Sequence, residues 1–152
     1  NGNISKHFGL QNKDGISEFL MKMAPLETIL LYEKTIGATV IPLGKAEQTS
    51  TGQLLSIKTE KLFKELRERF DVVVVHTGAV ILTSEAVELS PSVDNVLLVV
   101  RVGKTPIESA LLAKEKMEYV KAPVNGVVLA DYDYKKARRR DGYYYAFSTN
   151  QI

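Results

Sequence analysis

A polar pair, His76 and Thr77, directly follows a run of valines, Val72 to Val75. A run that is apolar at every position predicts a strand covered on both faces, as in a parallel α/β sheet. Ligands of such sheets lie outside the carboxyl ends of the strands, so His76 stands at the position where an active site of this fold would lie. An imidazole there could serve as a general base. No serine nucleophile or second metal ligand stands beside it, and Asp71 is about 16 Å away at the other end of the strand. We therefore favour the interpretation that His76 has no catalytic role.

The segments that must position this pair alternate between helical and strand patterns. Helices are expected at residues 17–23, 26–32, 53–70, 82–89 and 106–122, and strands at 38–43, 72–75, 96–100 and 126–129. Ser17 is the expected N-cap of the first helix, and Pro106 opens the last one. Its apolar face is expected to use Ile107, Leu111, Leu112, Met117 and Val120. The alternation predicts an α/β fold, a mostly parallel sheet flanked by helices.

The composition describes one soluble globular domain of 152 residues, 45% apolar and 25% charged. The net charge of +2 is too small to indicate a nucleic-acid or membrane partner by itself. The absence of cysteine excludes disulfides and thiolate metal sites. No signal peptide and no apolar run of about 18 residues is found. Because the chain does not begin with Met, a fragment or a processed chain is expected.

Several strings, taken in order, resemble one family. They are residues 6–10, 15–20, 66–71, 76–77, 85–86, 94–105 and 125–129. Together they resemble the cytoplasmic ATPase domain of the bacterial tyrosine kinases of capsule and exopolysaccharide biosynthesis. That fold is similar to the division-site ATPases with a deviant Walker motif. The resemblance covers nearly the whole chain, and its strongest piece is residues 94–105. It implies a P-loop NTPase-like fold that is truncated or degenerate here.

The chain departs from the family pattern at its nucleotide-handling motifs. The family's phosphate-binding loop cradles phosphates with backbone N–H groups and a lysine. No such loop is present, and Gly103-Lys104-Thr105 repeats only its last letters, at a different strand end. In the third motif His76 replaces an aspartate, although magnesium prefers oxygen ligands to imidazole. Gly78-Ala79 replace two prolines there, and Ala130 stands where the family often has asparagine near the base. This chain alone is therefore expected to transfer no phosphate.

The missing loop also has a structural consequence. In the family the phosphate-loop strand sits centrally in the sheet, so its absence predicts a gap between the strands at 72–75 and 96–100. Open strand edges invite pairing with another chain. Two outcomes stay open: the two strands meet directly, or a partner supplies the missing one.

Residues 131–152 are predicted to be a basic, tyrosine-rich tail that follows a degenerate ATPase-like domain at residues 1–130. Tyr143, Tyr144 and Tyr145 resemble the family's phosphoacceptor cluster, with packing on the domain or on a neighbour as an equal alternative. For Asp131, Asp133 and Asp141, a loop acid beside basic residues is favoured over a metal cage.

The tail also holds a basic docking patch. Its members are Lys135, Lys136, Arg138, Arg139 and Arg140. A solvated basic run is the first interpretation, and peripheral contact with an anionic membrane is the second. Nucleic acid is not expected, because the aromatic residues follow the basic run instead of alternating with it.

The resemblance implies a role in polysaccharide assembly or export. The leading hypothesis is a catalytically degenerate domain, an interaction or regulatory module for a membrane polysaccharide co-polymerase or export protein. Its place would be the cytoplasmic face of the bacterial inner membrane. Two alternatives stay open: a fragment of an active tyrosine autokinase whose phosphate loop lies upstream, and a structural homo-oligomerisation domain. Mg·ATP is expected only if upstream residues or a partner complete the site, and no other cofactor or metal is expected.

Overall fold

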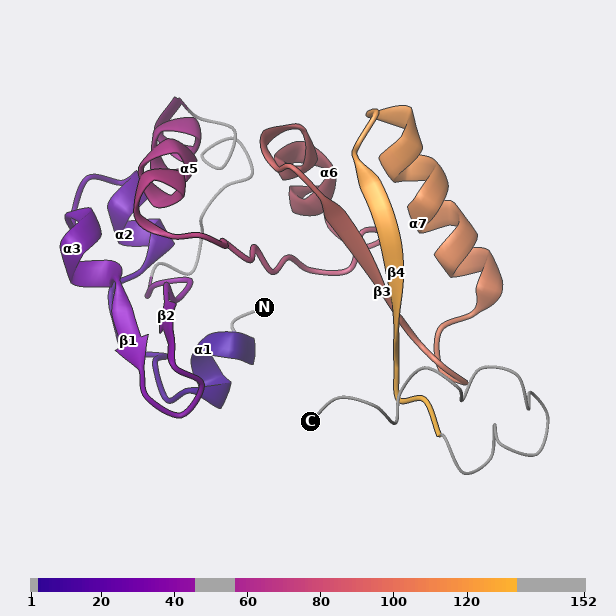
Figure 1. Ribbon diagram of the computed structural model, residues 1–152, viewed down its shortest axis with the longest axis horizontal. Coiled ribbons are helices and arrows are strands. Elements are labelled where there is room, and N and C mark those ends of the chain that lie inside the picture. The colour runs from indigo at the N-terminus through magenta and orange to yellow at the C-terminus, as the bar shows by residue number, and fades with distance from the viewer. Residues whose placement is uncertain (1–2, 46–56, 134–152) are drawn as a thin grey trace. The chain divides into compact units, whose positions relative to one another are not determined.

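The computed structural model describes residues 3–45 and 57–133 (Figure 1). The chain divides into two compact units, Asn1–Asp94 and Asn95–Ile152. The predicted tail lies almost wholly outside the described residues, so its separation from residues 1–130 stays a prediction. No helix in the described parts of either unit is long and apolar enough to cross a membrane.

The first unit is built from short helices and one hairpin. Its elements are α1 (Asn3–His7), α2 (Ile16–Leu20), α3 (Leu26–Ile29), β1 (Leu31–Glu33), β2 (Ala38–Val40), α5 (Ile57–Arg69), α6 (Glu85–Leu89) and a 3-10 turn at Ser90–Ser92. The core lies between α5 and the α3 region, where Leu62 and Leu66 pack with Ala24, Leu26 and Ile29. The helix α5 lies within the predicted helix at residues 53–70, and its buried Leu62 and Leu66 are four residues apart on one side.

The start of α2 corrects the predicted N-cap. Gly15, not Ser17, is the capping residue, and its N–H donates to Glu18 Oε2 at 2.8 Å. Glu18 Oε1 accepts a second bond from the Lys45 N–H at 3.0 Å. The Ser17 hydroxyl instead donates to the Leu43 carbonyl at 2.7 Å. The α2 terminus and the loop after β2 are thus joined through buried polar groups, which the local sequence pattern does not reveal.

The helix predicted for residues 26–32 is also shorter than expected. It ends at Ile29, and Leu30 takes an extended conformation. Leu31–Glu33 then pairs antiparallel with Ala38–Val40. Gly37 supplies the positive φ of +64° that the hairpin turn requires. Pairing between strands overrides the local helical pattern here, and Tyr32 lies in a strand.

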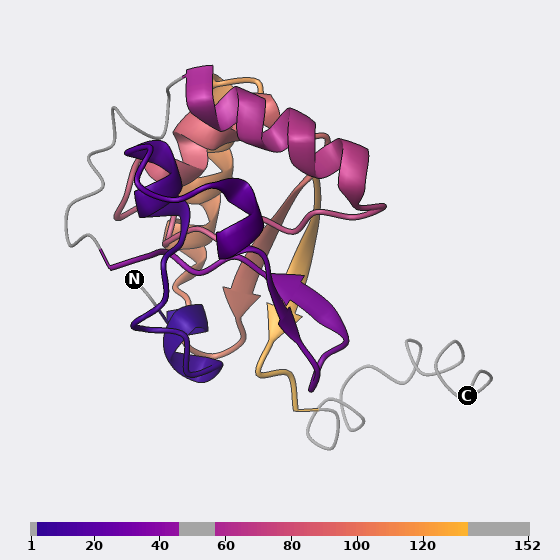
Figure 2. The ribbon, with the colours of Figure 1, turned by 90° about the vertical axis from the view of Figure 1, so that its left-hand side faces the viewer.

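The second unit is one βαβ element, with β3 (Val96–Arg101), α7 (Ile107–Tyr119) and β4 (Val124–Ala130). Figures 1 and 2 show β3 and β4 side by side. They pair in parallel, with Leu98 opposite Val127 and Val100 opposite Leu129. Pro106 is the N-cap of α7, and the helix ends ahead of Pro123. The predicted α/β fold with a parallel sheet and helices is confirmed.

The valine run is the main correction. Residues 72–75 have no regular secondary structure and pair with no strand among the described residues. Val74 is 87% exposed. A strand is held by hydrogen bonds to a neighbouring strand, and an apolar run cannot provide that neighbour by itself. The prediction therefore identified the composition of a buried strand but not its partner.

Three other expectations, two about burial and one about helix length, are wrong. The strands β3 and β4 are not covered on both faces, since Leu97 and Val127 are exposed. On α7, Ile107, Leu111 and Leu112 are exposed, while Met117 is buried. The helix expected at 82–89 begins only at Glu85, because Ala79 to Thr83 form a turn closed by the Thr83 N–H to Ala79 carbonyl bond.

Candidate functional site

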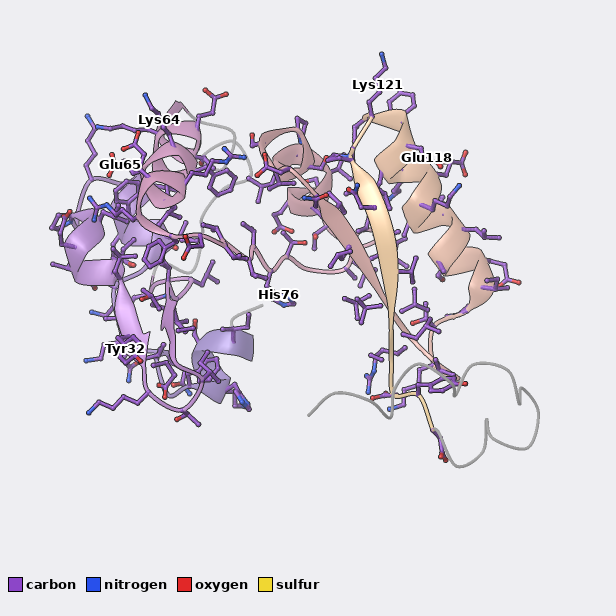
Figure 3. All side chains as sticks on the ribbon, viewed as in Figure 1. Tyr32, Lys64, Glu65, His76, Glu118 and Lys121 are labelled. Carbon is purple, nitrogen blue, oxygen red and sulfur yellow. The ribbon has the colours of Figure 1, made fainter. Side chains whose placement is uncertain are left out.

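The third-motif segment of the first unit carries the polar pair singled out from the sequence. His76 is exposed and lies on the irregular chain that follows the valine run (Figure 3). Its side chain makes no hydrogen bond or ion pair with the described residues. The Thr77 hydroxyl donates to the adjacent Gly78 carbonyl at 3.3 Å. The segment therefore presents an imidazole to solvent, and no acid within residues 3–45 and 57–133 is bonded to it to orient it as a catalytic base.

A carboxylate from α6 lies near the end of this segment. A Cβ built on Gly78 would lie 3.0 Å from Thr83 Oγ1 and 3.8 Å from Glu85 Oε2. Glu85 Oε2 and Glu88 Oε2 are both buried without a hydrogen-bond partner among the described residues. In the sequence, Glu85 belongs to one of the short strings that resemble the family, and no catalytic or binding role was predicted for it. Only the folded chain brings its carboxylate close to Gly78.

A carboxyl-end cluster is formed in the second unit by Arg101, Lys104, Thr105 and Asp131, where β3 and β4 end. Arg101 Nε donates to Asp131 Oδ2 at 2.9 Å, and Lys104 Nζ lies 3.2 Å from the same oxygen. The Lys104 ammonium and then the Arg101 guanidinium hold the pKa of the Asp131 carboxyl below its usual value. Two cations and one carboxylate leave the cluster with one net positive charge. The expectation that Asp131 is a loop acid beside basic residues agrees with these contacts.

This cluster does not fit a phosphate-binding loop. Such a loop aims several backbone N–H groups at the phosphates. Here the Arg101 N–H donates to Thr105 Oγ1 at 3.1 Å, and the Lys104 and Thr105 N–H groups donate to the Arg101 carbonyl. The Val102 N–H donates to the Ala130 carbonyl at 2.9 Å. The N–H groups of Arg101, Lys104 and Thr105 are thus used inside the turn and that of Val102 by β4, while the lysine pairs with Asp131. Gly103-Lys104-Thr105 therefore resembles a phosphate-binding loop in sequence only.

The remaining predicted site residues divide into two groups. Ala130 lies at the carboxyl end of β4, in register with Arg101. The phosphoacceptor candidates Tyr143, Tyr144 and Tyr145 lie outside the described residues, as does the whole basic docking patch. Among residues 3–45 and 57–133, no group of three His, Asp or Glu side chains could hold a metal ion.

No family model matches the chain. Among curated proteins, it is 28% identical over 130 residues to the tyrosine-protein kinase ptk of Acinetobacter johnsonii, covering 86% of this chain and 18% of the relative. It is 25% identical over 122 residues to the tyrosine-protein kinase etk of Escherichia coli K12, covering 80% of this chain and 17% of the relative. The chain therefore spans less than a fifth of the length of these two relatives.

Solved structures of two kinase domains also resemble the chain. The kinase domain of the Escherichia coli tyrosine kinase ETK matches with a TM-score of 0.80 at 24% identity, over 85% of this chain and 51% of that one. The VpsO kinase domain matches with a TM-score of 0.79 at 23% identity, over 86% of this chain and 64% of that one. The relatives and structural neighbours of this chain are thus bacterial tyrosine kinases, as the sequence resemblance predicts, and the chain has the α/β fold of their kinase domains.

Proposed function

We propose that the chain is a catalytically degenerate tyrosine-kinase-like domain that works as an interaction or regulatory module in exopolysaccharide or capsule biosynthesis. The observation that carries the proposal is His76. It holds the family's aspartate position, is exposed, and has no orienting acid among its hydrogen-bond partners. The internally bonded turn at Gly103-Lys104-Thr105 supports it, because no described backbone cradle there is open to a phosphate.

The proposal also covers the cellular location of the chain and its binding partner. A membrane polysaccharide co-polymerase or export protein is the expected partner, and the cytoplasmic face of the bacterial inner membrane is the expected location. Both are implied by the sequence resemblance to the tyrosine kinases of capsule and exopolysaccharide biosynthesis, and the similarity to two tyrosine-protein kinases supports that resemblance. The basic docking patch would give a second, electrostatic contact with anionic lipid.

Calorimetric titration with Mg·ATP, with Mg·ADP in parallel, tests the degenerate character. We expect no binding heat up to millimolar nucleotide. His76→Asp restores one oxygen ligand, and we expect it to restore no binding by itself, since no phosphate cradle accompanies it. Micromolar binding by the natural chain would contradict the proposal.

An active tyrosine autokinase completed by further sequence is the second candidate. The chain spans only 18% of the ptk kinase, so this candidate is a proposal about a longer protein. Phosphotyrosine that forms with Mg·ATP in the longest natural polypeptide, and that disappears in a His76→Ala variant, would select this candidate. Phosphotyrosine that requires an added kinase would support the degenerate module.

A further inference from the structure

The link between α2 and α3 borders a hollow on the surface of the first unit. Figures 1 and 2 show α5 beside α2 and α3, and Ala24 of the link joins Leu62 and Leu66 of α5 in the core. The hollow has a volume of about 470 Å³, within the range of ligand pockets. It is lined by the end of α2, the link and one residue of α5, namely Phe19, Lys22, Met23, Ala24, Pro25 and Lys61.

The chain leaves α2 through a turn that places Lys22 and Met23 beside this hollow. The Met23 N–H donates to the Glu18 carbonyl at 2.8 Å, and the Lys22 N–H donates to the Phe19 carbonyl at 3.0 Å. This is the hydrogen-bond pattern of a Schellman helix end. Lys22 takes its left-handed position, with a φ of 59°, where glycine is usual. Strained residues of this kind cluster at functional sites, so the position of this lysine indicates a role beyond ending the helix.

The residues around the hollow combine exposed apolar surface with positive charge. In a Schellman motif the residue at the position of Met23 commonly packs on the helix, but Met23 is 72% exposed. Lys22 makes no ion pair with the described residues, and the Lys61 ammonium makes only a long contact of 3.8 Å with Glu65 Oε1. No acidic side chain is among the described residues that line the hollow. Apolar contact beside two cations suits a ligand that is both apolar and negatively charged.

We propose that this hollow binds a short acidic segment of another protein, with one apolar side chain seated on Phe19 and Met23 and carboxylates at Lys22 and Lys61. Methionine suits such a surface, because its flexible thioether adapts to the side chain that it meets. A membrane is a poorer fit, since a hollow has no apolar side chains to insert into lipid. A second copy is also a poorer fit, because around a twofold axis the lysines of one copy would face those of the other. The proposal identifies a binding surface and does not rest on the loss of catalysis.

Selection of phage-displayed random peptides on the 152-residue chain tests this proposal. We expect the enriched peptides to share acidic residues around one apolar side chain. A synthetic peptide of the enriched sequence is then titrated by fluorescence polarisation. Lys22→Glu combined with Lys61→Glu should weaken its binding by at least about tenfold, because both cations become like charges. Met23→Ala changes no charge and should weaken binding by about threefold through lost apolar contact. A circular dichroism melt checks that each variant remains folded.

Lys34→Glu combined with Lys64→Glu is the matched control. Both lysines are exposed residues of the first unit, neither lines the hollow, and the net charge changes equally. Binding of the selected peptide should stay within about twofold, since salt screens distant charges.

Equal loss of binding in the two double variants would overturn the proposal, because it would show general attraction to a basic protein. A selection without an acidic and apolar consensus would also overturn it. So would an effect of the Lys22→Glu/Lys61→Glu variant that falls on another ligand while no peptide binds. Lost sedimentation with phosphatidylserine vesicles would then identify a membrane contact, and lost self-association in sedimentation equilibrium would identify a second copy.

Discussion

The two units differ in where their apolar side chains lie. In the first unit, Ile29 and Leu62 are 0% and 2% exposed and belong to one contiguous core. Among residues 95–133 of the second unit, Met117 is the one buried apolar side chain. Both units carry strongly apolar segments, so hydrophobicity does not explain the difference. Burial requires close packing between layers. In the first unit α5 packs against the α3 region, whereas in the described part of the second unit Met117 of α7 is the one apolar side chain that is buried.

The two units also differ in the burial of their charged side chains. Glu18 in the first unit is buried and accepts two backbone N–H bonds. Asp131 in the second unit makes its ion pairs at the surface. Buried, charge-assisted bonds contribute more to stability than exposed ion pairs. The predictions below test whether the contrast holds in solution.

The largest expected effect is on the core of the first unit. Leu62→Ala should lower the free energy of unfolding by about 2–5 kcal/mol, because a fully buried side chain leaves a cavity. Leu97→Ala is the control in the second unit, with an expected change below about 0.5 kcal/mol. Urea unfolding followed by circular dichroism measures both. Equal losses would show that Leu97 is covered in solution.

A smaller loss is expected at the carboxylate that joins α2 to the loop after β2. Glu18→Ala removes both of its backbone hydrogen bonds and should cost about 1.5–3 kcal/mol, the range for bonds to charged groups. Glu60→Ala, on the exposed side of α5, is the control and should be close to neutral. Urea unfolding followed by circular dichroism measures both variants. An unchanged free energy of unfolding in Glu18→Ala would mean that the contact between α2 and the loop after β2 is not formed in solution.

The space around one glycine in each unit, Gly15 and Gly126, can be compared by substituting alanine. A Cβ on Gly15 would lie 2.2 Å from the Pro42 carbonyl oxygen, so Gly15→Ala should cost about 1–3 kcal/mol by displacing backbone. A Cβ on Gly126 would meet only the Leu97 Cδ2 atom, at 3.3 Å, and that side chain can move. Gly126→Ala should change the thermal midpoint little. A large loss at Gly126 would indicate a sheet more tightly packed than described.

The smallest effect concerns Asp131. Its pKa is lowered in the folded chain, so the stability it contributes is complete above the unfolded pKa and is lost as the pH falls through the folded pKa. Lys104→Gln removes the largest cause and should raise the Asp131 pKa toward its ordinary value, as measured by carboxyl carbon NMR. Lys116→Gln on α7 is the control. An unchanged Asp131 pKa in Lys104→Gln would show that the ion pair does not form in solution.

Much of the fold follows from the sequence where the signal is local. The helix α5, the strands β3 and β4, and the Pro106 start of α7 are predicted because periodicity and proline geometry act within a few residues. The family resemblance is likewise carried by short strings. The candidate site was predicted less well, since Glu85 near Gly78 and the Arg101–Asp131 pair each join residues that are not adjacent in sequence.

By itself, then, the sequence determined which segments are apolar, and its resemblance to the tyrosine kinases predicts His76 in the place of the family's aspartate. Only the tertiary structure decided that Val72–Val75 pairs with no strand among the described residues, that β3 and β4 remain half-covered, and that the donors near Lys104 are used internally. The physical reason is that composition is a property of one segment. Pairing and burial are properties of two, and the second partner must be present in space.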